Sequence, residues 1–191
     1  MPRIREIGAI CGMAVPIVAF AAILSSIALS PWFSWYSNAL SDLGNYARSS
    51  VAIIFNLGLV ISGILTVVFG LGIFDDLKGS KPGRVGALVL MMAGAALTGI
   101  GIFSEDAGRI HFYVSVAFFS LVPISLLILG PTMIAGGSRK LGALSVIIAF
   151  LAAIPWAFSW EGVAIPETIS AAFASAWSIT FGVKMLKGRL K

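Results

Sequence analysis

The chain has 191 residues, of which 59% are apolar and only 11% are charged. A soluble globule of this size needs more polar side chains on its surface, so the composition excludes a soluble domain and predicts an integral membrane protein. The net charge of +5 does not indicate nucleic-acid binding, because the basic residues lie at the ends of apolar segments, where a membrane surface accounts for them. The single cysteine, Cys11, excludes an internal disulfide and is interpreted as a packing residue.

Six apolar segments are long enough to cross a bilayer as helices. The first is longer than the apolar region of a typical signal peptide, and no clear cleavage signal follows it. The sequence therefore predicts an all-α membrane protein, a six-transmembrane-helix bundle with residues 1–191 as a single domain. The predicted spans are approximately 7–29, 51–74, 85–103, 110–134, 141–158 and 168–185.

The connection between the first two spans, residues 30–50, is the longest polar segment. It begins with Pro31 and is rich in aromatic side chains of the kind found at membrane interfaces, such as Trp32, Trp35 and Tyr36. We expect this connection to form a short helix that lies along the membrane surface.

The basic residues predict the orientation of the chain, because loops rich in Lys and Arg stay on the cytoplasmic side. Six spans place both termini on one side, together with the connections at 75–84 and 137–140. The sequence therefore predicts a multi-pass protein of the plasma membrane with both termini in the cytoplasm and most of the acids outside. The cytoplasmic set holds 11 of the 13 basic residues: Arg3, Arg5, Lys78, Lys81, Arg84, Arg139, Lys140, Lys184, Lys187, Arg189 and Lys191.

Two spans carry stripes of small residues at four-residue spacing, which predict close helix packing. Ser62, Thr66 and Thr98 could form a polar pathway, but hydroxyls within spans commonly bond carbonyls of their own helix. No ionisable residue lies in the middle of a span, and this disfavours a proton-coupled transporter. The stripes are Gly58, Ser62, Thr66 and Gly70 in the second span, and Ser170, Ala174, Ser178 and Gly182 in the sixth.

A charged cluster interrupts the apolar sequence at residues 103–115, FSEDAGRIHFYVS, which contain the only histidine. His111 is the candidate general base, because histidine titrates near neutral pH and a carboxylate can orient it. Asp42, Glu105 and Asp106 are the candidate carboxylate partners.

A second set of polar residues is predicted to line a pocket in the outer third of the bundle: Ser41, Asn56, Ser115, Glu167 and Ser170. An amide or carboxylate inside a span is costly unless it meets a partner, which favours a shared pocket. The alternative is that each of these groups only satisfies a local helix end. One histidine without a metal-binding pattern predicts no metal site, and no cofactor is evident.

Several of these motifs, taken in order, resemble a known family. They are SDLG at 41–44, Asn56 early in the second span, FSEDAGRIH leading into the fourth, and Gly162 with Glu167 before the last. From about residue 10 to 185 the chain is similar to the prokaryotic integral membrane proteins catalogued as domain of unknown function 998. Ser104 and Thr168 depart from the proline and arginine that relatives often have there. The resemblance implies six spans and a prokaryotic, archaeal or bacterial, source, and it names no reaction.

Two functions remain open from the sequence. The first is binding, in which the outer pocket holds a membrane lipid, a small ligand, another membrane subunit or a second copy of the chain. The second is an enzyme that acts on a lipid or isoprenoid headgroup at the outer leaflet with His111 and a carboxylate as acid and base.

Overall fold

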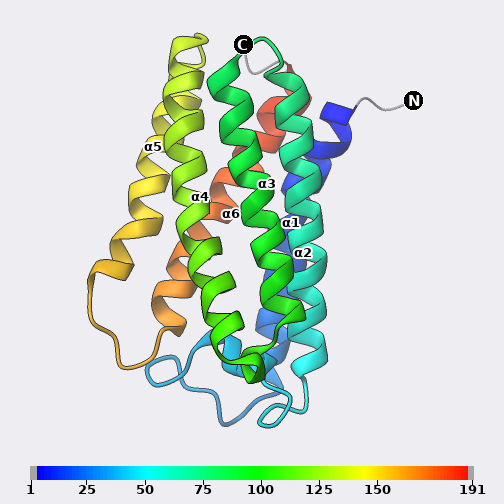
Figure 1. The fold of residues 1–191 in the computed structure, drawn as a ribbon, viewed down its shortest axis with the longest axis vertical. Helices are drawn as coiled ribbons and strands as arrows, with labels where there is room; N and C mark the ends of the chain where they lie inside the picture. Colours follow the sequence, from blue (N-terminus) through cyan, green and yellow to red (C-terminus); the bar gives the residue numbers. More distant parts are fainter. Residues whose placement is uncertain (1–3, 189–191) are drawn as a thin grey trace.

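In the computed structural model, which describes residues 4–188, the chain forms six long helices that run side by side along one axis (Figure 1). Each of these helices is long and apolar enough to cross a membrane, the fifth only together with the short 3-10 turn that extends it to Ala157, so the predicted six-helix membrane fold is confirmed. Arg3, Arg189 and Lys191, which contribute to the predicted charge asymmetry, lie outside the described residues. The helices are α1 Ile4–Ala28, α2 Ala52–Asp76, α3 Lys81–Ile102, α4 Arg109–Ala135, α5 Arg139–Ala153 and α6 Ala164–Lys187.

The long helices form a closed ring. Each packs against the next in the chain, and α6 packs against α1. Successive helices run in opposite directions, so α1 begins and α6 ends at the same end of the bundle (Figure 1). We call this the basic end, because the described part of it carries Arg5, Lys78, Lys81, Arg84, Arg139, Lys140, Lys184 and Lys187.

The opposite end holds the three connections that contain short 3-10 helices, namely η1 Leu40–Gly44, η2 Glu105–Ala107 and η3 Ile154–Ala157. We call it the acidic end, because Asp42, Glu105, Asp106, Glu161 and Glu167 lie there.

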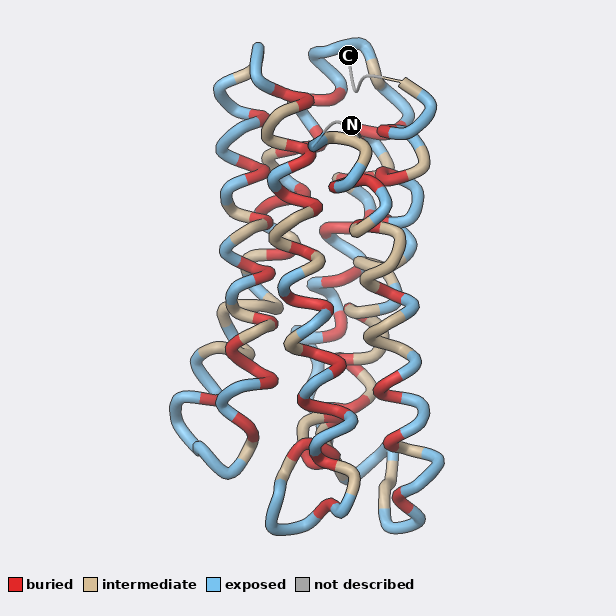
Figure 2. Tube along the Cα trace, turned by 90° about the vertical axis from the view of Figure 1, so that its right-hand side faces the viewer, coloured by how far each residue is buried: buried red, intermediate tan, exposed pale blue. Residues whose placement is uncertain are grey.

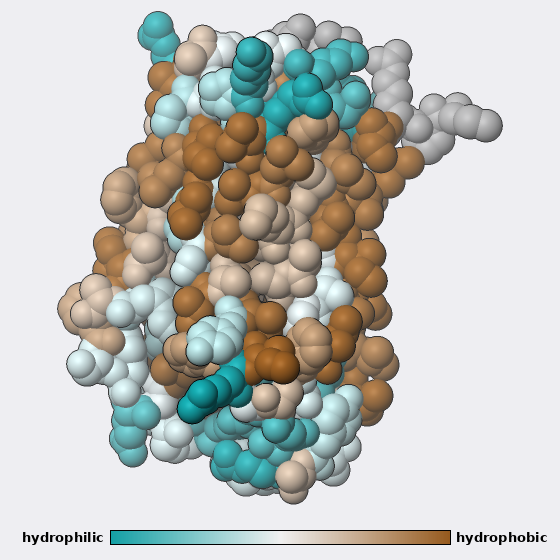
Figure 3. All heavy atoms as spheres, viewed as in Figure 1, coloured by the Kyte–Doolittle hydropathy of each residue, from teal (hydrophilic) through white to brown (hydrophobic). Residues whose placement is uncertain are grey.

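The outer faces of the bundle are apolar. Figure 3 shows a hydrophobic belt between two polar ends, and Figure 2 shows that the buried positions recur along the interior side of the helices. Large apolar side chains project outward, as at Ile17, which is 70% exposed, and Met92, which is 58% exposed. Such surface is stable only in hydrocarbon, so this is a multi-pass membrane protein.

Small residues bring the helices close together, as their spacing predicted. Gly58, Ser62, Thr66 and Gly70 are all buried on α2. A Cβ atom added at Gly94 of α3 would lie 2.8 Å from the carbonyl oxygen of Gly63, so the two backbones touch there. On α6, Ser170, Ser178 and Gly182 are likewise buried, and Ala174 is partly buried.

The helix limits differ from the predicted spans by a few residues for local reasons. Helix α3 begins at Lys81 instead of 85, because the Ser80 hydroxyl caps it by accepting the N–H of Gly83 at 3.2 Å. Helix α6 begins at Ala164 instead of 168, because Pro166 is tolerated in a first turn, where its missing N–H costs no helix bond. Proline ends α5 early, since Pro155 leaves only the 3-10 turn η3 at that point.

A short helix is present between the first two spans, but it does not lie on the surface. Leu40 and Leu43 of η1 are 6% and 0% exposed. They are three residues apart, and this spacing puts both on one face of a 3-10 helix. That face packs on Phe55 and Leu59 of α2, so the hydrophobic effect draws η1 into the end of the bundle.

Candidate functional site

Three buried side chains hold η1 in the acidic end of the bundle. Glu167 of α6 accepts the backbone N–H of Leu40 at 2.7 Å through Oε2. Asn56 of α2 donates its amide to the carbonyl of Gly44 at 2.8 Å. The two bonds satisfy one backbone group at each end of η1, so α2 and α6 fix this turn from opposite sides.

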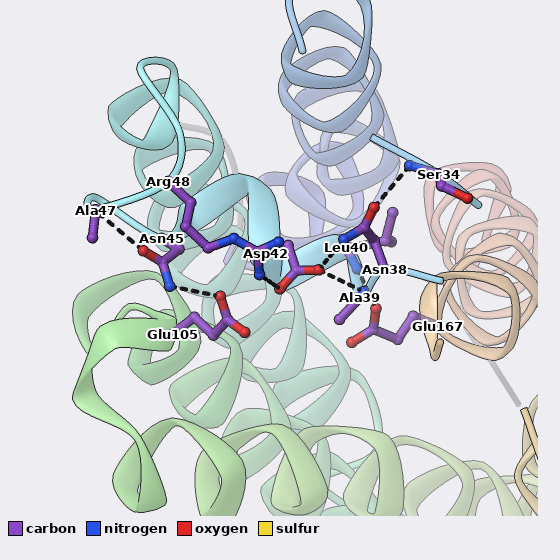
Figure 4. A network of polar contacts seen from close by, with 10 residues as sticks. All are labelled: Ser34, Asn38, Ala39, Leu40, Asp42, Asn45, Ala47, Arg48, Glu105 and Glu167. Carbon is purple, nitrogen blue, oxygen red and sulfur yellow. Dashed lines mark hydrogen bonds and ion pairs between the residues drawn. The ribbon is translucent and has the colours of Figure 1, made fainter. Parts of the chain in front are cut away.

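Asp42 is the third of these side chains, and it organises the loop around it (Figure 4). Its Oδ2 atom accepts the amide of Asn38 at 2.6 Å and the backbone N–H of Ala39 at 3.1 Å. Its Oδ1 atom pairs with Arg48 at 3.2 Å. Because Asp42 is only 6% exposed and its hydrogen bonds and ion pair are with residues 38, 39 and 48, it shapes the 38–48 segment.

The connection between α3 and α4 is tied to the same segment. Asn45 donates its amide to Oε2 of Glu105 at 2.9 Å, and the backbone N–H of Tyr46 donates to Asp106 at 3.1 Å. Two distant connections are thus joined at the acidic end.

Glu105 lies within reach of a second carboxyl group, that of Asp42. Burial raises the pKa of Glu105 above its ordinary value, and the neighbouring carboxyl group of Asp42 raises it further, while Asn45 and Arg48 act in the opposite direction. This part of the site therefore holds a proton more tightly than an isolated glutamate does.

His111 lies in the first turn of α4 and is 8% exposed. Its Nδ1 lies 2.7 Å from the carbonyl oxygen of Phe103. A carbonyl only accepts, so Nδ1 carries the proton and Nε2 of the neutral ring is an acceptor. Nε2 has no hydrogen-bond partner among residues 4–188. The carbonyl of Phe103 therefore orients the imidazole ring, and Nε2 has no partner among these residues.

A groove of about 770 Å³ runs beside His111, between α4 and the η3–α6 region. Ser41, Glu105, His111, Ser115 and Glu167 lie along its polar part. Its remaining wall is mainly apolar, with Phe112, Val116, Phe119, Pro123, Ile124, Ala153, Trp156 and Val163.

The groove opens on the outside of the bundle. Phe112, Val116 and Ile124 on its wall are 62%, 48% and 45% exposed. From His111 to Ile124 it follows about 20 Å of α4, at 1.5 Å per residue. Its polar part is near the acidic end, and its apolar part extends toward the middle of the helices.

A smaller cavity of about 120 Å³ lies inside the bundle, lined mainly by apolar residues of α1, α2, α3, α4 and α6. Ser41, Ser115, Phe119 and Glu167 line both this cavity and the groove. These four residues therefore stand where the outside groove meets the interior of the bundle.

The hydroxyl groups at this junction differ from those within α2 and α3. Ser62, Thr66 and Thr98 donate to the carbonyls four residues earlier, which confirms the expectation for hydroxyls within spans. The side-chain hydroxyls of Ser41 and Ser115 make no hydrogen bond with any described residue.

The sequence-derived candidates fall into two groups in space. Ser41, Glu105, His111, Ser115 and Glu167 lie around the groove. The others are engaged elsewhere in the same end: Asp42 and Asp106 bind the 39–48 segment, Asn56 binds Gly44, and Ser170 accepts from Trp156 at 2.9 Å and donates to Ala152 at 2.7 Å. Within residues 4–188, no three His, Cys, Asp or Glu side chains are grouped so as to hold a metal ion.

Some residues of the site carry no signal that sequence reasoning used. Phe119 and Trp156 shape the groove but look like ordinary span residues. Asn38 and Asn45 complete the network, yet polar residues in a connection are expected wherever a loop meets water. The two asparagines on either side of the SDLG motif, Asn38 and Asn45, are the one clue to this network in the sequence.

Comparison with known proteins gives a family but no activity. No curated protein and no solved structure matches the chain. A family model matches residues 13–184, which is most of the chain and includes both the η1 turn and the groove. The chain belongs to the family described as protein of unknown function (DUF998).

Proposed function

We propose that this protein binds an amphiphilic molecule, a membrane lipid or a small ligand with an apolar tail, in the groove beside His111. The protein would lie in the plasma membrane with its acidic end on the outer side. The polar part of the groove would then hold the head of the ligand, and the apolar part would hold its chain.

The observation that carries this proposal is the gradient of polarity along α4. Glu105 and His111 lie at one end of the groove, Ser115 lies one turn further along, and Phe119 and Ile124 follow. A ligand site of this size with an apolar wall and a few convergent polar groups is typical of small-molecule binding. The position of these groups near a helix end matches the depth at which a lipid headgroup meets its chains.

Native mass spectrometry of the purified protein tests this function. The wild type should retain one amphiphile per chain when it is released from mild detergent. In Val116→Trp the added ring fills the groove wall, so retention should be lost. Val85→Trp is the matched control, because Val85 is 49% exposed, against 48% for Val116, and lines neither the groove nor the central cavity.

Equal retention by both variants would exclude the groove as the site. Retention of a protein mass in place of an amphiphile would favour a partner subunit or a second copy of the chain.

An enzyme is the second candidate, and His111 favours it. Its Nδ1–H is held by the carbonyl of Phe103 and its Nε2 is unpartnered beside a groove, which is the arrangement that a general base requires. The substrate would be the headgroup of an outer-leaflet lipid or isoprenoid. Turnover of such a lipid by the wild type and not by His111→Gln would support this alternative.

A further inference from the structure

We infer that the groove selects amphiphiles whose polar group donates hydrogen bonds and carries no negative charge, such as a long-chain alcohol or amine, and rejects phosphate and carboxylate heads. This inference rests on the proposed binding function and specifies its ligand.

The charges around the groove carry the first step. Glu105 and Glu167 line its polar part, whereas no Lys or Arg of the described chain lines it. Arg48, in the neighbouring connection, is already paired with Asp42, and Arg109 at the start of α4 is not among the lining residues. Anionic heads are normally held by Arg or Lys, and an anion here would face two carboxyl groups at close range without either.

The second step concerns two acceptor atoms at the groove that have no hydrogen-bond partner within residues 4–188. Glu167 uses Oε2 for the N–H of Leu40, and its Oε1 has no hydrogen-bond partner among the described residues. His111 likewise has a free acceptor at Nε2. Both side chains line the groove, so a group that enters it can reach these two acceptors. That group must donate hydrogen bonds.

The hydroxyls of Ser41 and Ser115 complete the complementarity, because each can donate as well as accept. An alcohol head can therefore donate to Glu167 or His111 and accept from a serine. An ammonium head can donate to both acceptors and neutralise a carboxylate.

One feature of the groove favours anionic heads, but it is weaker than the features that disfavour them. The N-terminus of α4 at Gly108 borders the groove, and a helix N-terminus carries a partial positive charge of about half an elementary charge. No Lys or Arg among the lining residues reinforces this partial charge. The first backbone N–H of α6 is already used, since Ala164 donates to the carbonyl of Asn38 at 2.9 Å.

A competition experiment tests the selectivity. The delipidated protein is mixed with equal amounts of oleyl alcohol, oleylamine, oleic acid and oleoyl lysophosphatidic acid, and the bound species are measured by native mass spectrometry. The alcohol, the amine or both should be retained about tenfold more than either anion, a ratio that corresponds to about 1.4 kcal/mol. Glu167→Gln removes a group that can carry a negative charge and keeps an acceptor for Leu40, so it should reduce the discrimination against oleic acid.

The outcomes separate the two claims. Preferred retention of either anionic amphiphile would overturn the selectivity while leaving amphiphile binding intact. Retention of none of the four would overturn both the selectivity and the proposed function. Val116→Trp is the control that assigns any retention to the groove.

Discussion

Leu40 donates its backbone N–H to Oε2 of Glu167 over 2.7 Å, a hydrogen bond between residues 127 positions apart in the chain. Glu167 is 8% exposed, so water does not replace this bond if it is lost. The contact joins the first turn of α6 to η1, and the same carboxylate lines both the groove and the central cavity. One side chain thus takes part in the fold and in the proposed site.

Replacement of Glu167 should separate these two roles. Glu167→Ala leaves the N–H of Leu40 buried without an acceptor, which should lower the free energy of unfolding by about 1–3 kcal/mol. Glu167→Gln keeps an acceptor and should recover most of the loss. Thermal unfolding in detergent measures both variants. Glu161→Ala is the control, because Glu161 is exposed in the connection before α6 and its removal should change little. Similar melting temperatures for all three variants would show that the bond to Leu40 adds no stability.

The contact between α2 and α3 should be sensitive to added volume. A Cβ at Gly63 would lie 2.6 Å from the carbonyl oxygen of Gly94, so Gly63→Leu must push the helices apart. Overpacking of this kind costs about 1–3 kcal/mol. At Gly79, in the turn between these helices, an added Cβ meets nothing within 4 Å, and Gly79→Leu should leave the melting temperature unchanged. An equal drop for the two variants would contradict close packing at Gly63.

The paired carboxyls predict a pH dependence of stability. The pKa of Glu105 is raised in the folded protein, mainly by burial and then by Asp42, so the folded state holds this proton more tightly than the unfolded chain. The contribution is fully present below the ordinary glutamate pKa of about 4.3 and is lost as the pH rises through the raised value. The wild type should therefore lose melting temperature relative to Glu105→Gln between acid and neutral pH. A constant difference between the two across that range would rule out the raised pKa.

Orientation in the membrane can be tested by labelling. We expect the basic end in the cytoplasm and the acidic end outside, from the distribution of Lys and Arg. In a Cys11→Ala background, Ala47→Cys lies in the exposed part of the α1–α2 connection and should react with an impermeant maleimide on intact cells. Gly79→Cys, at the basic end, should react only after permeabilisation. The reverse pattern would invert the predicted topology.

The sequence was most informative where the physical signal is local. A span is recognised from about 20 consecutive apolar residues, and a small-residue stripe from its four-residue spacing, so both were predicted without knowledge of neighbouring helices. The burial of Asn56 followed from the cost of an unpaired amide in a span. The sequence did not predict the partner of Asn56, the carbonyl of Gly44, because every backbone carbonyl of the connection was an equal candidate.

The groove was only partly predictable for the same reason. His111 and Glu167 stood out as polar groups next to apolar segments. Whether the two side chains line the same groove depends on how α4 and α6 are rotated about their own axes. Polar and apolar residues alternate too weakly around these helices for the sequence to determine that rotation. Trp156 could have been assigned equally well to a membrane interface, so its place on the groove wall emerges only from the packing of η3.

Photo-crosslinking with an amphiphile that carries a diazirine on its chain tests the proposed binding site most directly. Oleyl alcohol modified in this way should label the protein in membranes, and peptide mass spectrometry should place the adducts on groove residues such as Phe112, Val116 and Trp156. Excess unlabelled alcohol should suppress these adducts, and Val116→Trp should abolish them. Adducts spread over lipid-facing residues such as Ile17 and Met92, without competition, would contradict a specific site in the groove.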